Sequence, residues 1–388
     1  MLIDRIVEGL TKEIVAKGKS SAIVNPEECV FKGTSTEVSQ HFTAREWSDG
    51  LLIIPPTVEL ITEFLKHTKI PRHDTVATLL PDQRVATPWN IAVNGVMAGC
   101  APEHMPLLIA MAEALGDDRF ALNMIGSSSG LIPFAVFNGP VIGQLGISAG
   151  PRTISMGINP VLGRALGLMI KNIGGYRPTS NYMGTFGYQL GFAIAEFEKE
   201  SPWEPFNVTQ GFDPGTSTVS LGVTNNWGPS PGAASTDDLG GADTALELLS
   251  REIKKKGRLY NYPGIGPNAE HVMVTLLMTP SVARSLAEAG YSKRGVKQYL
   301  YENTKMPIRD FEWVLRHQSI LGRTVREMVE AGGYPKEFLG GPDDMVRILA
   351  SPDILHIVIC GDPNRNRVMV LEGGHTRPTT KQIRLLDK

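Results

Sequence analysis

The sequence has few of the residues that mark secreted, nucleic-acid-binding or membrane proteins. Its 388 residues include three cysteines, too few for a disulfide framework or a four-thiolate metal cluster. The formal net charge of −2 provides no broad basic surface for nucleic acid or an anionic membrane. Charged residues interrupt the apolar residues at the start of the chain. We therefore expect a cytoplasmic protein with no nucleic-acid or membrane partner, acting on a small molecule.

The motifs of common cofactor and metal sites are also missing. The glycine-rich stretch 146–159 fits neither the P-loop nor the Rossmann pattern, and no HExxH or paired CxxC occurs. The run 126–130, Gly-Ser-Ser-Ser-Gly, lacks a secure nucleophile-elbow context. We predict no nucleotide cofactor and no metal, while a metal site assembled from distant residues stays open.

Hydrophobic residues make up 42% of the chain, enough for a substantial core. Leu2 to Val15 carries apolar residues at helical spacing, and this stripe needs a packing partner. Farther along, apolar runs predict strands at 51–54, 120–125, 132–137, 218–223, 271–279, 354–360 and 368–371, the last two as a hairpin. Helical patterns lie between these runs, including 57–67 with Thr57 as its cap, a helix that begins at Thr87-Pro88, and 102–115, 159–174 and 243–256. This alternation predicts an α/β fold of mixed sheets with flanking helices, in two lobes around a cleft.

A segment rich in glycine and proline divides the chain. We predict an N-terminal α/β lobe at 1–209, a loop or lid at 210–242 and a C-terminal α/β lobe at 243–388. Aromatic residues within the segment favour a lid ordered over a cleft, and Asp213, Asn225 and Asn226 are its candidate substrate contacts. The alternatives are a simple linker, and polar residues that only cap their own turns.

The strongest candidate for chemistry is a cysteine, a carboxylate and an imidazole within five residues: Cys100, Glu103 and His104. Pro102 suits the first turn of a helix, so Cys100 would lie just before a helix N-terminus. Unpaired backbone N–H groups and the helix dipole there favour a thiolate. The alternative is that Cys100 is a small buried hydrophobe.

A second candidate site would hold an anion. Asn159-Pro160 predicts an N-cap followed by a helix, and a glycine-rich loop leads into it, so backbone N–H groups would face a carboxylate or phosphate. Arg152 and Arg164 could clamp a carboxylate, or could serve only in structural ion pairs. Ser128 is a candidate ligand contact in its own loop.

Several motifs together resemble a family of poorly characterised bacterial proteins associated with UGSC-type thiol or selenol proteins. They are the runs Asp49–Thr57, Asn94–His104, Glu200–Pro205 with Gly211–Pro214, and Ile354–Cys360. The resemblance implies a soluble bacterial enzyme or enzyme subunit in which the Cys100 region recurs. This chain has no Cys-Gly-Ser-Cys, since Gly361-Asp362 follows Cys360.

From these patterns we predict a small-molecule enzyme that uses thiolate or acid/base chemistry, with lyase or hydratase as the preferred class. A thiol-linked oxidoreductase is the rival enzyme class. A third hypothesis is a non-catalytic subunit of an enzyme complex, and a homo-oligomer or a partner subunit is compatible with each hypothesis.

Overall fold

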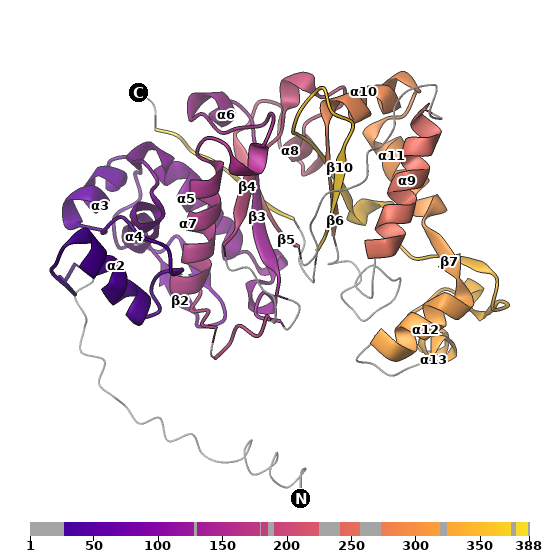
Figure 1. Ribbon diagram of the computed structural model, residues 1–388, viewed down its shortest axis with the longest axis horizontal. Coiled ribbons are helices and arrows are strands. Elements are labelled where there is room, and N and C mark those ends of the chain that lie inside the picture. Colours follow the sequence, from indigo (N-terminus) through magenta and orange to yellow (C-terminus); the bar gives the residue numbers. More distant parts are fainter. Residues whose placement is uncertain are drawn as a thin grey trace, which may run out of the picture.

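The structure is a computed structural model, and it describes residues 27–127, 130–178, 180–184, 190–224, 241–256, 273–318, 324–373 and 378–386. Two sheets stand near the middle of the molecule, with one group of helices on the outer side of each (Figure 1). This arrangement confirms the predicted α/β fold of mixed sheets with flanking helices.

The N-terminal helices begin where the sequence predicts caps. In α3 (Val58–Leu65) the Thr57 side chain accepts from Leu60 N, and in α4 (Pro88–Ala98) a capping box joins Thr87 and Asn90. Gly99 ends α4 in the left-handed conformation, with φ 97°. The helices on this side are α2 (Ser35–Ala44), α3, α4, α5 (Met105–Leu115), α6 (Val141–Gln144) and α7 (Asn159–Asn172).

The first sheet has the strand order β11-β5-β3-β4. Its central strand β3 pairs with β4 in parallel and with β5 antiparallel. Every residue of β3, β4 and β5 is buried, as expected for strands covered on both faces. The strands are β3 (Ile132–Asn138), β4 (Phe192–Ala195), β5 (Thr218–Thr224) and β11 (Thr379–Gln382).

The second sheet repeats this arrangement with the order β10-β6-β9. Its central strand β6 pairs with β9 in parallel and with β10 antiparallel, as β3 does with β4 and β5. The strands are β6 (Val274–Met278), β9 (Leu355–Ile359) and β10 (Val368–Glu372). Its outer helices are α9 (Gly241–Lys256), α10 (Pro280–Glu288) and α11 (Lys293–Asn303). The strands β5-β3-β4 of the first sheet and β10-β6-β9 of the second therefore share one topology.

Four layers result from the alternation of side chains along these strands. Phe134 of β3 and Leu277 of β6 belong to one apolar cluster between the sheets, whereas Phe137 and Leu276 face helices on the two outer sides. The space between the sheets is thus a packed core. The cleft between two lobes stays a prediction.

Smaller elements complete the fold. A peripheral cluster contains α12 (Ile308–Gln318), α13 (Val325–Glu330) and the strands β7 (Lys305–Pro307) and β8 (Met345–Arg347). The hairpin of β1 (Ala77–Leu79) and β2 (Arg84–Ala86) lies before α4, and α8 (Phe206–Thr209) lies between β4 and β5.

Three secondary-structure predictions are wrong. Residues 51–54 form no strand, because Arg164 binds the carbonyls of Leu51 and Leu52 and two prolines follow. Residues 120–125 fall in short 3₁₀ turns. The predicted hairpin of β9 and β10 is also wrong, because β6 lies between these strands.

The predicted boundaries do not separate the two sheets. The segment 210–242 contains β5, an interior strand of the first sheet. The C-terminal segment contains β11, which pairs with β5 rather than with the second sheet. Long-range pairing decides these positions, and no local pattern reports it.

Candidate functional site

Cys100 lies between α4 and the short 3₁₀ turn Pro102–His104 that leads into α5. A helix lies on each side of Cys100 as predicted, but the environment of the thiol differs from the predicted one. Cys100 is buried in the N-terminal core, and desolvation raises its pKa to about 12. The expected lowering by the helix dipole is therefore wrong in direction. The packing alternative for Cys100 describes its surroundings better.

The two residues predicted to assist Cys100 point to different environments. Glu103 is exposed, whereas His104 is buried and its Nδ1 accepts from Ala101 N at 3.0 Å. Burial lowers the pKa of His104, with the charge of Glu103 opposing this effect. His104 is thus a neutral cap of its own turn, and a catalytic role for this trio stays a prediction.

Asn159 fastens its own loop. Its Oδ1 accepts from Ser148 N at 2.9 Å, and its Nδ2 donates to the carbonyls of Ser148 and Thr153. The side chain is fully buried, and the N-cap position of α7 is Ile158 rather than Asn159. Arg152 is exposed, in the left-handed region with φ 58°. At the predicted anion site, the Asn159 side chain therefore binds backbone groups of the protein itself.

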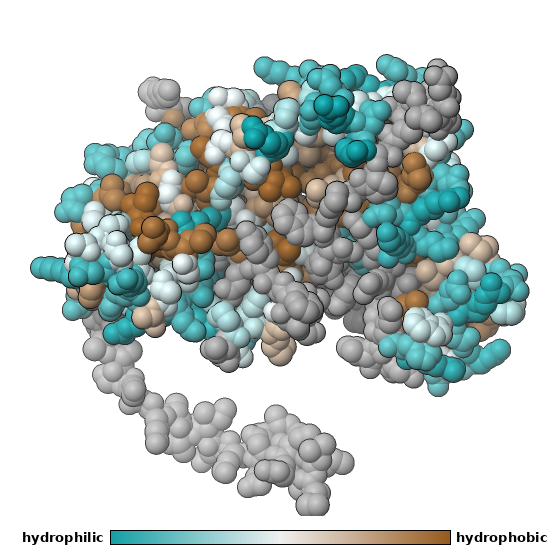
Figure 2. Space-filling model, in the orientation of Figure 1, coloured by the Kyte–Doolittle hydropathy of each residue, from teal (hydrophilic) through white to brown (hydrophobic). Residues whose placement is uncertain are grey.

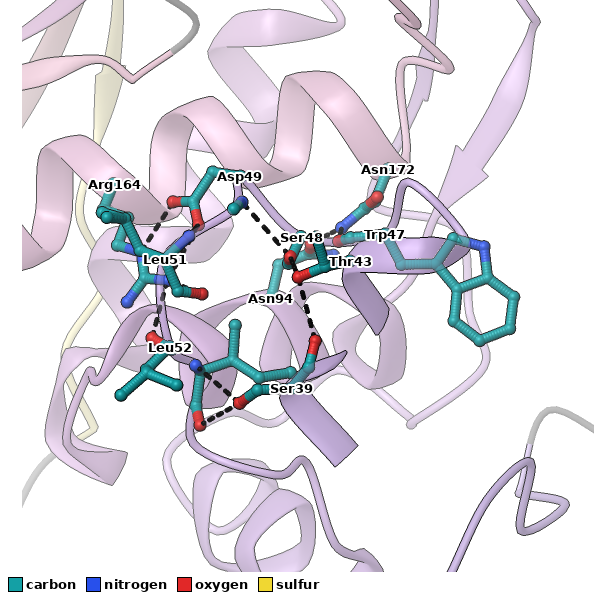
Figure 3. A network of polar contacts seen from close by, with 12 residues as sticks. Ser39, Thr43, Trp47, Ser48, Asp49, Leu51, Leu52, Asn94, Arg164 and Asn172 are labelled. Carbon is teal, nitrogen blue, oxygen red and sulfur yellow. Dashed lines mark hydrogen bonds and ion pairs between the residues drawn. The ribbon is translucent and has the colours of Figure 1, made fainter. Parts of the chain in front are cut away.

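Arg164 does clamp a carboxylate, and the carboxylate is that of Asp49. Its Nε lies 2.7 Å from Asp49 Oδ2, and its Nη2 lies 2.9 Å from Oδ1, a bidentate pair (Figure 3). The same Nη2 donates to the carbonyl of Leu52 at 2.9 Å. This pair holds residues 49–52 against α7 in a non-strand conformation.

The remaining predicted contacts do not gather in one place that the structure describes. Ser128, Asn225 and Asn226 lie outside the described residues. Asp213 is exposed in a turn, where its carbonyl accepts from Thr216 N. The lid over a cleft stays a prediction.

A cavity that the sequence did not reveal lies beside α4. Its volume is about 730 Å³, and its apolar wall includes Phe42, Trp47, Trp89, Val93 and Met97. Other parts of the lining come from residues 27–33, from 55–59, from Ile61 and from the end of α7. Apolar cavities of this size with a few polar groups are typical of small-molecule sites.

An amide pair forms the polar part of the wall. Asn172 Nδ2 donates to the Trp47 carbonyl and to Asn94 Oδ1, each at 2.8 Å (Figure 3). Asn94 Nδ2 donates to the Asn90 carbonyl. The backbone acceptor at Trp47 fixes which way the Asn172 amide is oriented. The network therefore holds α4, α7 and residue 47 in place around the cavity.

Two guanidinium groups line the same cavity. Arg84 pairs with Asp82 at 2.6 Å and donates to the Asn172 carbonyl. Arg177 is half-buried, donates to the carbonyls of Lys171 and Tyr176, and makes no ion pair within 4 Å with any residue that the structure describes. Desolvation and then the charge of Arg84 lower the pKa of Arg177. An anionic group in the cavity would relieve both effects.

A carboxylate and an imidazole lie next to each other at the rim of this cavity. Glu27, which belongs to the lining, lies 2.8 Å from Arg72 Nη1 and 3.3 Å from His73 Nε2. The hydrogen bond from Arg72 leads the effects that lower the pKa of Glu27, so this residue is a carboxylate near neutral pH. His73 packs beside Trp89, with ring centroids 5.9 Å apart.

A second polar centre is buried between the two halves, at the end of β4. Glu196 Oε2 accepts from Asn138 Nδ2 at 2.6 Å and from Phe206 N, while Oε1 faces Ile359 N and, at 3.8 Å, Lys293 Nζ. Burial raises the pKa of Glu196, with Lys293 opposing it, and burial followed by the Glu196 charge raises the pKa of Cys360 to about 12. None of the residues of this centre was among the site residues predicted from the sequence.

No family model, curated protein or solved structure matches this chain. The resemblance to the UGSC-type family therefore stays a prediction. Within the described ranges, no three or more histidine, cysteine or acidic residues are placed to hold a metal ion. No helix in those ranges has the length and apolar character to cross a membrane.

Proposed function

We propose that the protein is a small-molecule enzyme whose substrate binds in the cavity beside α4, with its apolar body against Trp47 and Trp89 and a carboxylate toward Arg177. The half-buried Arg177 without an ion pair among the described residues is the observation that carries this proposal. A guanidinium is suited to bidentate binding of a carboxylate.

Lyase or hydratase chemistry remains the preferred reaction class, now assigned to acid/base groups rather than to a thiolate. In this scheme His73 removes a proton from the carbon next to the substrate carboxylate, the bond from the following carbon to its hydroxyl group breaks, and a double bond forms between the two carbons. His73 returns the proton to the departing hydroxyl group, so a β-hydroxy acid becomes an α,β-unsaturated acid and water. Glu27 holds the imidazole in place. A thiol-linked oxidoreductase is less well supported, because both buried thiols have a raised pKa.

The binding step can be tested with matched ligands. Aryl and alkyl carboxylic acids should raise the melting temperature, and the corresponding amides should raise it less. Arg177→Met should remove this preference for the acids, whereas Arg119→Met, a change in an exposed ion pair elsewhere, should retain it. Equal shifts for acids and amides in the wild-type protein would refute the carboxylate assignment.

The reaction can be tested separately by proton NMR. Hydroxy acids that bind should exchange with their unsaturated counterparts in the presence of the enzyme, and His73→Gln should abolish this exchange while retaining binding. Binding without any exchange across the series would leave the ligand site intact and exclude the lyase or hydratase assignment.

The non-catalytic alternative has one observation in its favour. Leu51, Leu52, Ile54 and Val58 are exposed next to one another in sequence, at 52%, 75%, 47% and 45%. Adjacent exposed apolar residues of this size are typical of a contact surface. Such a surface is compatible with an enzyme as well, and its occupant is considered next.

A further inference from the structure

The surface around the cavity is unusually apolar. We call Leu51, Leu52, Ile54, Val58 and Leu60 the apolar ledge, since each is at least 40% exposed. Figure 2 shows apolar residues gathered over the N-terminal helices on this side of the molecule. The ledge meets the cavity at Val58, and the exposed Val30 and Phe31 extend the apolar surface along the cavity lining.

The ledge is held in an exposed position by specific contacts. The Asp49–Arg164 ion pair is largely buried, and Arg164 also binds the carbonyls of Leu51 and Leu52. Two prolines then lead into α3. A rigid backbone that presents leucines outward loses little conformational entropy when a partner binds.

We propose that the ledge and the open side of the cavity bind the N-terminal segment of the same chain, residues 2–15, as an amphipathic helix. Ile3, Ile6, Leu10 and Ile14 fall on one face at 3.6 residues per turn, and Lys12 falls on the opposite face. This stripe is the predicted apolar face that needs a partner, and the ledge is an apolar face that needs a cover.

Chain length makes this contact possible within one molecule. The first described residue, Glu27, itself lines the cavity. Residues 16–26 could span up to about 36 Å when extended, and a helix over residues 2–15 would be about 21 Å long. The helix can therefore reach the ledge from Glu27 without a second copy. This proposal does not rest on the identity of any ligand.

One experiment changes the helix in the full-length protein. Leu10→Asp places a charge on its apolar face, and the matched control Lys12→Asp places the same residue on its polar face. Binding of 8-anilinonaphthalene-1-sulfonate should increase severalfold in Leu10→Asp and stay at the wild-type level in Lys12→Asp. Equal dye binding by both variants would overturn the proposal.

A second experiment changes the ledge. Val58→Asp should speed tryptic cleavage after Arg5 and Lys12, whereas Leu339→Asp, at 42% exposure in the turn that contacts α13, should not. Unchanged cleavage in Val58→Asp would refute the contact.

Sedimentation velocity decides where the helix binds: one species of monomer mass for wild type and Leu10→Asp supports the contact within one chain. A wild-type dimer that Leu10→Asp dissociates would assign the helix to a second copy and overturn it.

Discussion

The centre around Glu196 and the cavity beside α4 both place charged side chains out of bulk water. They differ in the partners that these charged groups have. Glu196 has N–H donors on both oxygens and the ammonium of Lys293 nearby, and both residues are almost fully buried. Arg177 gives N–H groups to two carbonyls and has no carboxylate partner among the described residues. A charged group that is paired within the protein supports the fold, whereas a charged group that faces a cavity without an ion-pair partner is available to a ligand.

The topology explains why Glu196 occupies its position. Glu196 N donates to the Phe137 carbonyl at the end of β3, and Cys360 N donates to the Met278 carbonyl at the end of β6. The two residues thus hold equivalent places in the two halves, and Phe197 N donates to the Ile359 carbonyl across them. The Glu196 carboxylate links the halves at the point where their equivalent strands end.

The largest effect should come from breaking that centre. Glu196→Ala leaves the Lys293 ammonium buried without its carboxylate partner, so we expect the free energy of unfolding to fall by about 3–5 kcal/mol. Glu200→Ala is the matched control, because Glu200 pairs with Arg284 at the surface, and it should cost less than about 1 kcal/mol. Urea unfolding of both variants measures the difference. Similar losses would show that Glu196 does not differ from a surface glutamate.

Replacing each of two asparagines by alanine should give losses of stability that differ by a smaller amount. Asn172→Ala removes a donor from two acceptors beside the cavity, where water can replace it, so the loss should be about 1 kcal/mol. Asn207→Ala removes the donor to the Thr216 carbonyl in a fully buried position and should cost about 2–3 kcal/mol. Thermal or urea unfolding measures both losses. A larger loss for Asn172→Ala than for Asn207→Ala would contradict the expectation that water reaches the cavity wall.

An intermediate case is Asp117, which joins the end of α5 to β11 through Lys381 at 2.7 Å. The Arg119 guanidinium, followed by Lys381, holds the pKa of Asp117 well below its usual range. A depressed carboxyl pKa adds stability that is present above the unfolded value and is lost as the pH falls below about 4. Asp117→Asn should therefore cost about 1 kcal/mol near neutral pH, since the partners are partly exposed.

The measurement for Asp117 is the free energy of unfolding as a function of pH. The difference between wild type and Asp117→Asn should shrink as the pH falls from about 4 to about 2, because Asp117 then takes up a proton in the unfolded state while the native carboxylate stays ionised. A difference that stays constant over this range would mean that Asp117 contributes without its charge.

The smallest effect concerns the thiols. Cys29 is exposed and lines the cavity, whereas Cys100 and Cys360 are buried with pKa values raised to about 12. A disulfide reagent at pH 8 should label Cys29 in the folded protein, and the other two thiols only after unfolding. A carboxylate ligand of the cavity should slow the labelling of Cys29. Rapid labelling of Cys100 in the folded protein would restore the thiolate hypothesis.

Local patterns predicted many of the elements. Thr87-Pro88 located the start of α4, and the alternation of strands and helices identified the α/β class. Such features depend on capping and on periodicity over a few residues. The strand at 51–54 failed because four apolar residues in a row also suit an exposed ledge when a distant arginine takes their carbonyls.

The site was less accessible to prediction. The conspicuous cluster of Cys100 and His104 is buried packing, while Trp47, Asn94, Asn172 and Arg177 meet at the cavity from separate parts of the chain. No spacing in the sequence links Asn94 to Asn172, 78 residues apart. A proline or cap acts on its neighbours alone, so only the packing of α4 against α7 brings these amides together.

By itself, then, the sequence determined the fold class, several helix starts and the absence of common cofactor motifs, because each depends on nearby residues. Tertiary structure alone decided that β6 separates β9 from β10, that β11 joins the first sheet and that Arg164 binds Asp49. It also decided which charged side chains are paired within the protein and which face the cavity. Strand pairing, burial and ion pairing join residues far apart in the chain, and their energies exist only once the chain has folded.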